Sequence, residues 1–281
     1  MTGASVAARE GRWAWRFTGF MTVCVYIFMF APIVATVILS FNDSMFGGFP
    51  MTGVSLRWYA KLMTNEPVLA AFKTSLWIAL VTAAVSTLVG VIAAVALVRF
   101  DFRGKQTIST LVLLPALVPE TILGVGLLVL IQAVHQPRTL WLLLLGHILL
   151  TLPYVVLIVQ ARLVGVRRSY EEAALSLGAP RISTFREITL PLLIPAVMAS
   201  ILLAFTISFD NTSASLFWRP AGVETMPTQI LAMLKISISP EINALGTIMI
   251  LVTVGVPLVG GAILQGVSHF RKRSNKKGNQ P

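Results

Sequence analysis

The stretch that decides the fold is SYEEAALSLGAPRISTFREITLP, residues 169–191. Ser169, followed by Glu172 three positions later, matches a capping box at the start of a helix. Ala173 and Ala174 favour helix in the turn that follows. Because these alanines are small, they leave one flat face of the predicted helix, which the surface of another protein can approach closely.

The middle of the same stretch carries signals for a turn. Gly178 can take the left-handed conformation that commonly ends a helix. Pro180 suits the start of a new helix, because proline lacks a backbone N–H and its φ is already helical. The stretch therefore predicts a helix, a tight turn and a second helix.

The composition around this stretch indicates a lipid environment. Of the 281 residues, 56% are hydrophobic and only 12% are charged, whereas soluble domains carry about 25% charged residues. The net charge of +11 raises the possibility of nucleic-acid binding. However, the Lys and Arg residues stand between long apolar runs rather than on one basic face, so we expect no nucleic-acid partner.

Six apolar segments are long enough to cross a membrane, which takes about 20 helical residues. We therefore expect an all-α membrane protein, with a single transmembrane domain over residues 1–281. The expected spans are Phe17–Ser40, Thr74–Val98, Thr107–Val134, Thr139–Leu163, Leu190–Ser208 and Leu245–Val267.

The distribution of basic residues predicts the orientation. Most of the 22 Lys and Arg residues fall before the first span, after the second, after the fourth and after the last. Cytoplasmic segments carry this excess of positive charge. Both termini and the 169–191 loop should therefore be cytoplasmic, with the basic tail 271–281 lying at the membrane surface.

The spacing within the 169–191 loop resembles the EAA loop of binding-protein-dependent ABC importer permeases, which implies a type I importer-like permease fold. In that family the loop forms a coupling helix that sits in a cleft of the ATPase. The resemblance implies an ABC ATPase dimer as partner and ATP and Mg bound by that dimer, with no cofactor on this chain. The positions that carry it are Glu172, Ala173, Ala174, Gly178, Ile188, Leu190 and Pro191.

Four further stretches resemble the second permease subunit of the polyamine (spermidine/putrescine) branch of this family. The resemblance implies a polyamine substrate, a second and paralogous permease subunit, a periplasmic solute-binding protein and a bacterial inner membrane location. One position departs from the pattern, because Asn211 stands where close polyamine relatives often have a second acidic residue. The stretches are Ser55–Tyr59, Pro119–Glu120, Ser208–Asp210 and Pro240–Leu245.

Acidic residues near the spans are candidates for the solute pathway. Glu120 lies inside an expected span, where a carboxylate costs about 2.5–3.5 kcal/mol. Either it faces a cavity and attracts a cation, or Pro119 breaks the helix and Glu120 caps the next segment. Asp210 and Glu241 flank a long outside connection, where each could pair with an amine or be solvated.

Three other classes of function fit the sequence less well. An ion-coupled transporter could carry protons on Glu120, Asp210 and His147, but it has no use for the 169–191 loop, and a lone His in a span more often bonds a neighbouring helix. A membrane hydrolase would need a nucleophile beside a base, and the sequence shows no such pair. An ATPase would need a phosphate-binding loop, but Gly104-Lys105 is followed by Gln106 and lacks the upstream glycine of such a loop. We therefore expect no enzyme activity on this chain.

Within the importer class, an opine or amino-phosphonate is the alternative substrate.

Overall fold

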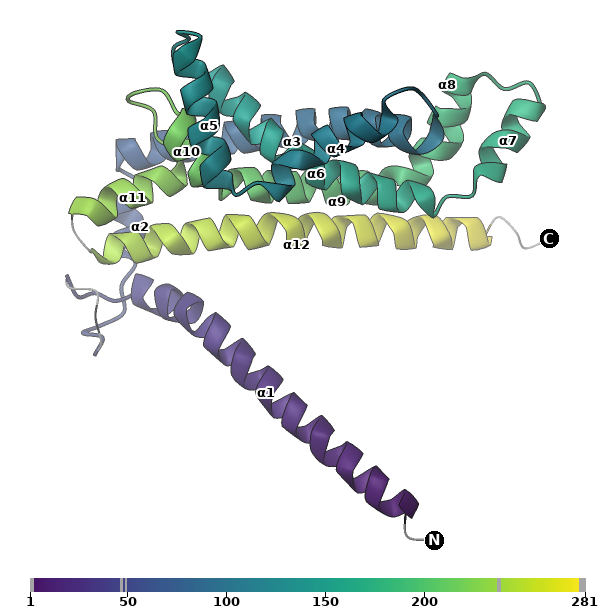
Figure 1. Ribbon diagram of the computed structural model, residues 1–281. Coiled ribbons are helices and arrows are strands. Elements are labelled where there is room, and N and C mark those ends of the chain that lie inside the picture. The colour runs from purple at the N-terminus through teal and green to yellow at the C-terminus, as the bar shows by residue number, and fades with distance from the viewer. Residues whose placement is uncertain (1–2, 46–47, 49, 237–238, 278–281) are drawn as a thin grey trace. The chain divides into compact units, whose positions relative to one another are not determined.

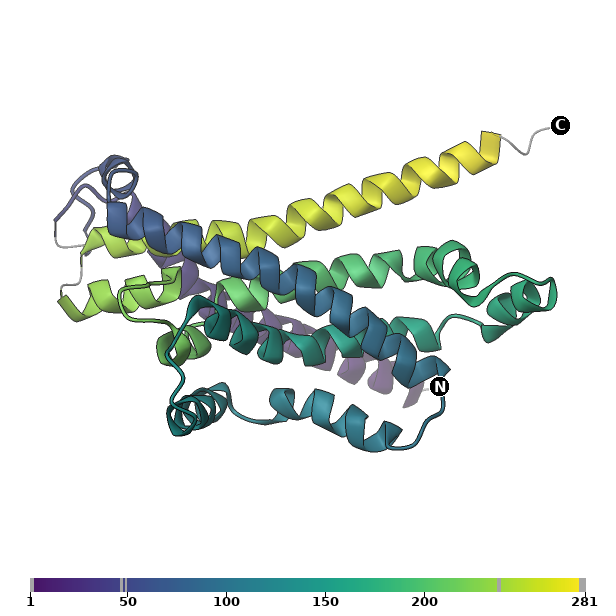
Figure 2. The ribbon, with the colours of Figure 1, turned by 90° about the horizontal axis from the view of Figure 1, so that it is seen from above.

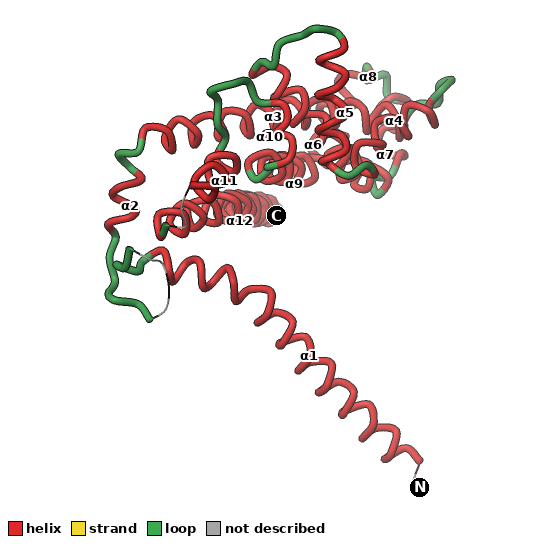
Figure 3. Tube along the Cα trace, turned by 60° about the vertical axis from the view of Figure 1, so that its left-hand side comes forward, coloured by secondary structure: helices red, strands yellow, loops and turns green. Residues whose placement is uncertain are grey.

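The computed structural model describes residues 3–45, 48, 50–236 and 239–277. Across these residues the chain is almost entirely helical (Figure 3), and the one β-bridge joins Asn42 to Val54. The helices are α1 (Gly3–Ser40), α2 (Arg57–Leu62), α3 (Glu66–Arg99), α4 (Lys105–Leu117), α5 (Glu120–Ala133), α6 (Leu140–Val164), α7 (Arg168–Ser176), α8 (Arg181–Thr184), the π-helix η1 (Phe185–Thr189), α9 (Leu190–Phe209), α10 (Ser213–Trp218), α11 (Met226–Ile236) and α12 (Pro240–Lys277).

The chain divides into two compact units. The first consists of Met1–Thr64 and Met233–Ile248, and the second of Asn65–Ala232 and Met249–Pro281. In the first unit, Trp58 is buried and its indole N–H donates to the carbonyl of Asn42 at 2.8 Å. This bond holds α2 against the bridge that follows α1.

The core of the second unit is formed by α3, α6 and α9, which pack against one another (Figure 1). Close packing of α3 on α6 depends on Gly90, because a Cβ there would collide with Val155. A buried hydrogen bond of 2.7 Å between the hydroxyls of Ser86 and Thr151 joins the same two helices. Small residues that allow close approach, and hydroxyls that pair between helices, are typical of helix contacts in membranes.

The expected span Thr107–Val134 does not form one continuous helix, so the prediction is wrong in this respect. The chain forms α4 and α5 instead, which are bent by 110° at the break between Leu117 and Glu120. Pro119 is the N-cap of α5 in an extended conformation, and the residue before a proline avoids the helical region for steric reasons. The helix break that the second alternative for Glu120 assumed is therefore present, with Glu120 as the first residue of α5 and no side-chain cap at this helix start.

Several helices are longer than the expected spans. Because the side chain of Asn65 accepts a hydrogen bond from the N–H of Val68, α3 begins before Thr74. The helix α12 begins before Leu245 and continues to Lys277, so the described part of the basic tail is helical. Among the described residues, five helices are long and apolar enough to cross a membrane, or six if the bent pair α4–α5 is one span.

Candidate functional site

The 169–191 loop forms the predicted pair of helices, α7 and α8, at the end of the second unit remote from α10 (Figure 2). The prediction of a capping box formed by Ser169 and Glu172 is wrong. The helix α7 begins at Arg168, with Arg167 as an N-cap that makes no side-chain bond. Ser169 therefore lies inside the first turn and cannot cap it. Glu172 instead pairs with Arg168 at 3.4 Å on the exposed face of α7.

The turn after α7 is closed by backbone hydrogen bonds around Gly178. Its φ is +85°, in the left-handed region. The N–H of Gly178 donates to the carbonyl of Leu175 at 3.0 Å, and the N–H of Ala179 donates to that of Ala174 at 3.1 Å. These two bonds form a Schellman motif, which satisfies carbonyls left unpaired at the helix end. The predicted role of Gly178 in the turn is therefore present.

The tip of this helix pair presents apolar side chains to its surroundings. Leu177 is 89% exposed and Ile182 is 82% exposed. Ala173 is also exposed, whereas Ala174 is half-buried. Such a group of large, exposed apolar side chains is typical of a surface that another protein covers.

The remaining loop positions lie where the loop joins the core. Ile188 belongs to the π-helix η1, and Leu190 and Pro191 begin α9. All three are half-buried. They therefore form the base of the loop rather than its tip.

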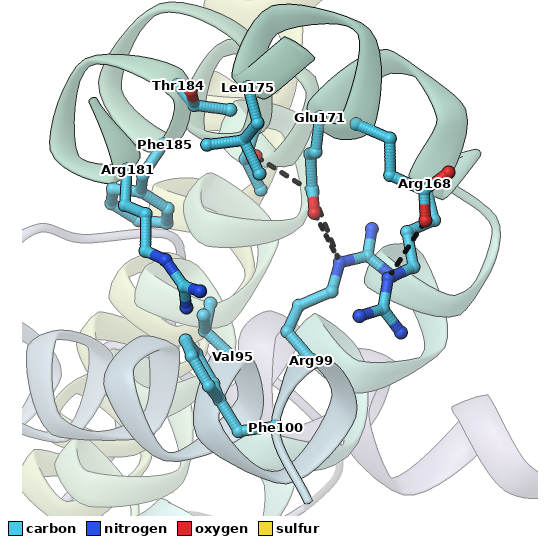
Figure 4. Close-up of a pocket in the computed structure, with 11 residues that line it drawn as sticks. Val95, Arg99, Phe100, Arg168, Glu171, Leu175, Arg181, Thr184 and Phe185 are labelled. Carbon is cyan, nitrogen blue, oxygen red and sulfur yellow. Dashed lines mark hydrogen bonds and ion pairs between the residues drawn. The ribbon is translucent and has the colours of Figure 1, made fainter. Parts of the chain in front are cut away.

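Glu171, which sequence reasoning did not select, binds the loop to the core. Its carboxylate lies 3.0 Å from Nε of Arg99 (Figure 4). It also accepts a hydrogen bond from the hydroxyl of Thr189 at 2.9 Å. Arg99 also donates from Nη2 to the carbonyl of Val166 at 3.1 Å. No local pattern links Arg99 to Glu171, which are 72 positions apart, so the sequence carries no signal for this cluster.

A second cluster lies at the bend between α4 and α5. The side-chain amide of Asn211 donates to Oε2 of Glu120 at 3.0 Å. Oδ1 of Asn211 accepts from the N–H of Ala214 at 2.7 Å, so both ends of this buried amide are used. Glu120 is exposed and lines a cavity of about 310 Å³ together with Pro119, Leu150 and Tyr154.

Buried hydrogen bonds connect this cluster to α6. Nδ1 of His147 lies 2.8 Å from the hydroxyl of Ser208, and Nε2 lies 3.2 Å from that of Ser215. Ser215 donates to the carbonyl of Asn211 at 2.8 Å. Because that single hydroxyl proton is used, Nε2 of His147 must be the donor toward Ser215. His147 thus bonds the neighbouring helices α9 and α10.

The other two acidic candidates have different surroundings. Asp210 directly follows α9, and desolvation raises the pKa of its carboxyl above the usual value. Glu241 belongs to the first unit, where its buried carboxylate pairs with Lys61 at 2.7 Å. The structure therefore brings together Glu120 and Asn211, with Asp210 adjacent in sequence, whereas Glu241 has a cationic partner of its own.

Comparison with known proteins points to one family. The model of a family described as binding-protein-dependent transport system inner membrane component matches residues 86–274. The permease PotC of the spermidine/putrescine transport system of Escherichia coli K12 is 38% identical over 261 residues, covering 93% of this chain and 95% of PotC. The putrescine permease PotI of the same strain is 36% identical over 241 residues, covering 82% of this chain and 84% of PotI.

Two weaker similarities accompany these. The putative 2-aminoethylphosphonate permease PhnV of Salmonella typhimurium is 27% identical over 214 residues, covering 75% of this chain and 80% of PhnV. One chain of a crystal structure of a bacterial ABC transporter, involved in the import of the acidic polysaccharide alginate, aligns with a TM-score of 0.73 at 14% identity. That alignment covers 94% of this chain and 99% of the other, and it shows a shared fold.

Proposed function

Because this chain belongs to the family of inner membrane components of binding-protein-dependent transport systems, we propose that it is one permease subunit of an ATP-driven polyamine importer. The observation that carries the proposal is the similarity to PotC and PotI along most of the chain. The coarser conclusion, an ABC importer permease, follows from the family. The substrate, the energy source and the partners are the proposal.

The α7–α8 tip is the proposed contact with the ATPase. Leu177 and Ile182 offer apolar surface there, and Ala173 leaves the adjoining face flat. An ABC ATPase dimer would bind ATP and Mg on its own chains and hydrolyse ATP there. Closure of that dimer would move the tip, and the spans behind it would follow as a rigid body.

Glu120 and Asp210 are the proposed contacts for a cationic solute. A carboxylate attracts an ammonium group more strongly in a cavity of low dielectric than in water. Glu120 already accepts one N–H from Asn211 and also lines the cavity at the α4–α5 bend.

Three kinds of partner complete the proposed assembly: the ATPase dimer, a second permease and a binding protein. Six spans would enclose too little space for a solute pathway, so a second permease would supply the other half. The resemblance to polyamine permeases implies that this second permease is a paralogue. A periplasmic binding protein would deliver the solute and select it. With both termini in the cytoplasm of a bacterium, the α7–α8 tip would reach the ATPase from the inner membrane.

Uptake by the reconstituted assembly tests the proposal. The chain would be co-purified with its proposed partners, an ATPase, a second permease and a binding protein, and incorporated into liposomes. We expect ATP-dependent uptake of putrescine or spermidine, absent with a non-hydrolysable ATP analogue. ATP-dependent uptake of 2-aminoethylphosphonate alone would support the second candidate, which the similarity to PhnV favours. Uptake without ATP, driven by a proton gradient, would contradict the importer class.

A further inference from the structure

The helix α7 packs on its immediate neighbours along the chain. Its packing partners are α8 and η1. In addition, the side chains of Arg99 and Glu171 connect it to the end of α3. Arg99 and Glu171 are 12% and 15% exposed, so their charges are largely withdrawn from water. Largely desolvated charge-assisted hydrogen bonds are stronger and more directional than exposed ones.

One carboxylate, that of Glu171, joins three segments of the second unit. It accepts from Arg99, the last residue of α3, and from Thr189, the last residue of η1, where α9 begins. Arg99 also binds the carbonyl of Val166, at the entrance to the loop. Both ends of the loop and the end of α3 therefore meet at this point.

The local helix geometry supports a special role for this junction. The five residues Phe185–Thr189 form a π-helix between α8 and α9. Single π-turns inside a helix are uncommon and frequently mark functional positions. Here the turn ends on Thr189, whose hydroxyl bonds Glu171.

We propose that Glu171 is a positioning residue that transmits movement of the α7–α8 tip to the ends of α3 and α9. The inference rests on the proposed function, because it assumes that the tip contacts an ATPase. With the cluster intact, α7 cannot tilt without pulling on Arg99 and Thr189. With it broken, the tip can still bind the partner but moves independently of the core.

Two substitutions break the cluster with little change in volume. Glu171→Gln removes the charge that holds Arg99, and Thr189→Val removes the hydroxyl but keeps the branched shape. Thr189→Ser is the matched control, since it retains the hydroxyl. Asp101→Asn is the charge control, because Asp101 is nearly fully exposed and pairs with Lys105, outside the cluster.

Hydrogen exchange of the complete complex measures the transmission directly. A non-hydrolysable ATP analogue should change amide exchange in α7 and at the end of α3 in the unmodified complex. In Glu171→Gln and Thr189→Val, we expect the change in α7 to persist and the change in α3 to disappear. Putrescine moved per ATP hydrolysed should fall about tenfold, the loss expected for replacing a charge-assisted hydrogen bond.

The two controls and the double variant sharpen the test. Thr189→Ser and Asp101→Asn should behave as the unmodified complex. The double variant Glu171→Gln/Thr189→Val should move no less putrescine per ATP than Glu171→Gln alone, because both substitutions act on one cluster.

The inference is overturned if Glu171→Gln and Thr189→Val both keep the change in amide exchange at the end of α3. It is also overturned if the fold loss of putrescine moved per ATP in the double variant equals the product of the two single losses. A variant that misfolds would fail to co-purify with the ATPase. The remaining one of Glu171→Gln and Thr189→Val would then provide the test of the inference. An unmodified complex with no response in α7 would instead contradict the proposed function and remove the basis for the inference.

Discussion

Nδ2 of Asn211 lies 3.0 Å from Oε2 of Glu120, although 91 positions separate them in the sequence. The pair joins the turn after α9 to the start of α5. An amide that donates to a carboxylate leaves one negative charge at this point, where an aspartate would give two.

The first prediction concerns this pair. Asn211→Asp places two carboxylates in hydrogen-bond contact, and they cannot both be ionised without a cation between them. We expect the free energy of unfolding to fall by about 1–3 kcal/mol without solute and to recover when putrescine is added. Putrescine uptake should stay unchanged or rise, and Glu120→Gln should reduce it.

The double variant Glu120→Gln/Asn211→Asp is the control for repulsion. It reverses the pair, so that a carboxamide again faces a carboxylate, and its thermal stability without solute should return toward that of the unmodified protein. A melting temperature as low as that of Asn211→Asp would show that repulsion is not the cause.

A pH profile tests Asp210. Desolvation raises the pKa of this carboxyl, so the protein is stabilised at low pH, and that stabilisation is lost as the pH rises through the raised pKa. Binding of a cation needs the ionised form, so uptake should change in the opposite sense and fall as the pH falls through the same range. Uptake and melting temperature would be measured between about pH 4 and pH 7.

The comparison variant is Asp210→Asn, which cannot titrate. Its uptake should be lower at neutral pH and should lack the loss at acidic pH that Asp210 causes. An acidic limb that is identical in both proteins would assign the titration to another group.

A third prediction concerns the turn after α7. Gly178 has a φ of +85°, and a Cβ added there would meet no atom within 4 Å, so a substitution strains the backbone without a steric clash. Gly178→Val should cost about 1–2 kcal/mol and misdirect α8. Uptake and stimulated ATPase activity should fall together while the chain still inserts in the membrane.

Gly178→Asn separates backbone strain from side-chain loss, since asparagine tolerates the left-handed region. It should retain most of the uptake. Normal transport by Gly178→Val would contradict the role of this turn in coupling.

Packing of α10 on α6 gives a fourth prediction. A Cβ at Gly146 would overlap the ring of Trp218, which is fully buried and donates its indole N–H to the carbonyl of Gly124 at 2.8 Å. Gly146→Ala should destabilise the protein by about 1–3 kcal/mol. Thermal unfolding in detergent measures this effect.

Gly126 provides the matched control because a Cβ there meets no atom within 4 Å. Gly126→Ala should be neutral or should stabilise α5 by up to about 1 kcal/mol, because alanine has the higher helix propensity. Equal losses in the two variants would refute the packing argument.

The orientation gives the fifth prediction. In a Cys24→Ser background, Gly222→Cys should react with an impermeant thiol reagent in intact cells, and Ser274→Cys should react only after the membrane is opened. Labelling of Ser274→Cys alone in intact cells would invert the orientation.

Local chemistry was sufficient to predict much of this protein from its sequence. Hydrophobic length indicated the spans, and glycine at 178 indicated the left-handed turn, because both properties depend on neighbouring residues alone. Pro119 offered a helix break as one of two alternatives, but the 110° bend depends on how α4 and α5 pack against the rest of the second unit.

Tertiary structure decided which polar groups meet. Glu171 and Glu172 are adjacent carboxylates on one short helix, and no local rule distinguishes them. Packing of α7 against η1 turns Glu171 toward Arg99 and Thr189, while Glu172 stays on the exposed face beside Arg168. Successive residues on a helix point in directions about 100° apart, so the side on which a helix packs determines which of two neighbouring charges becomes buried and paired.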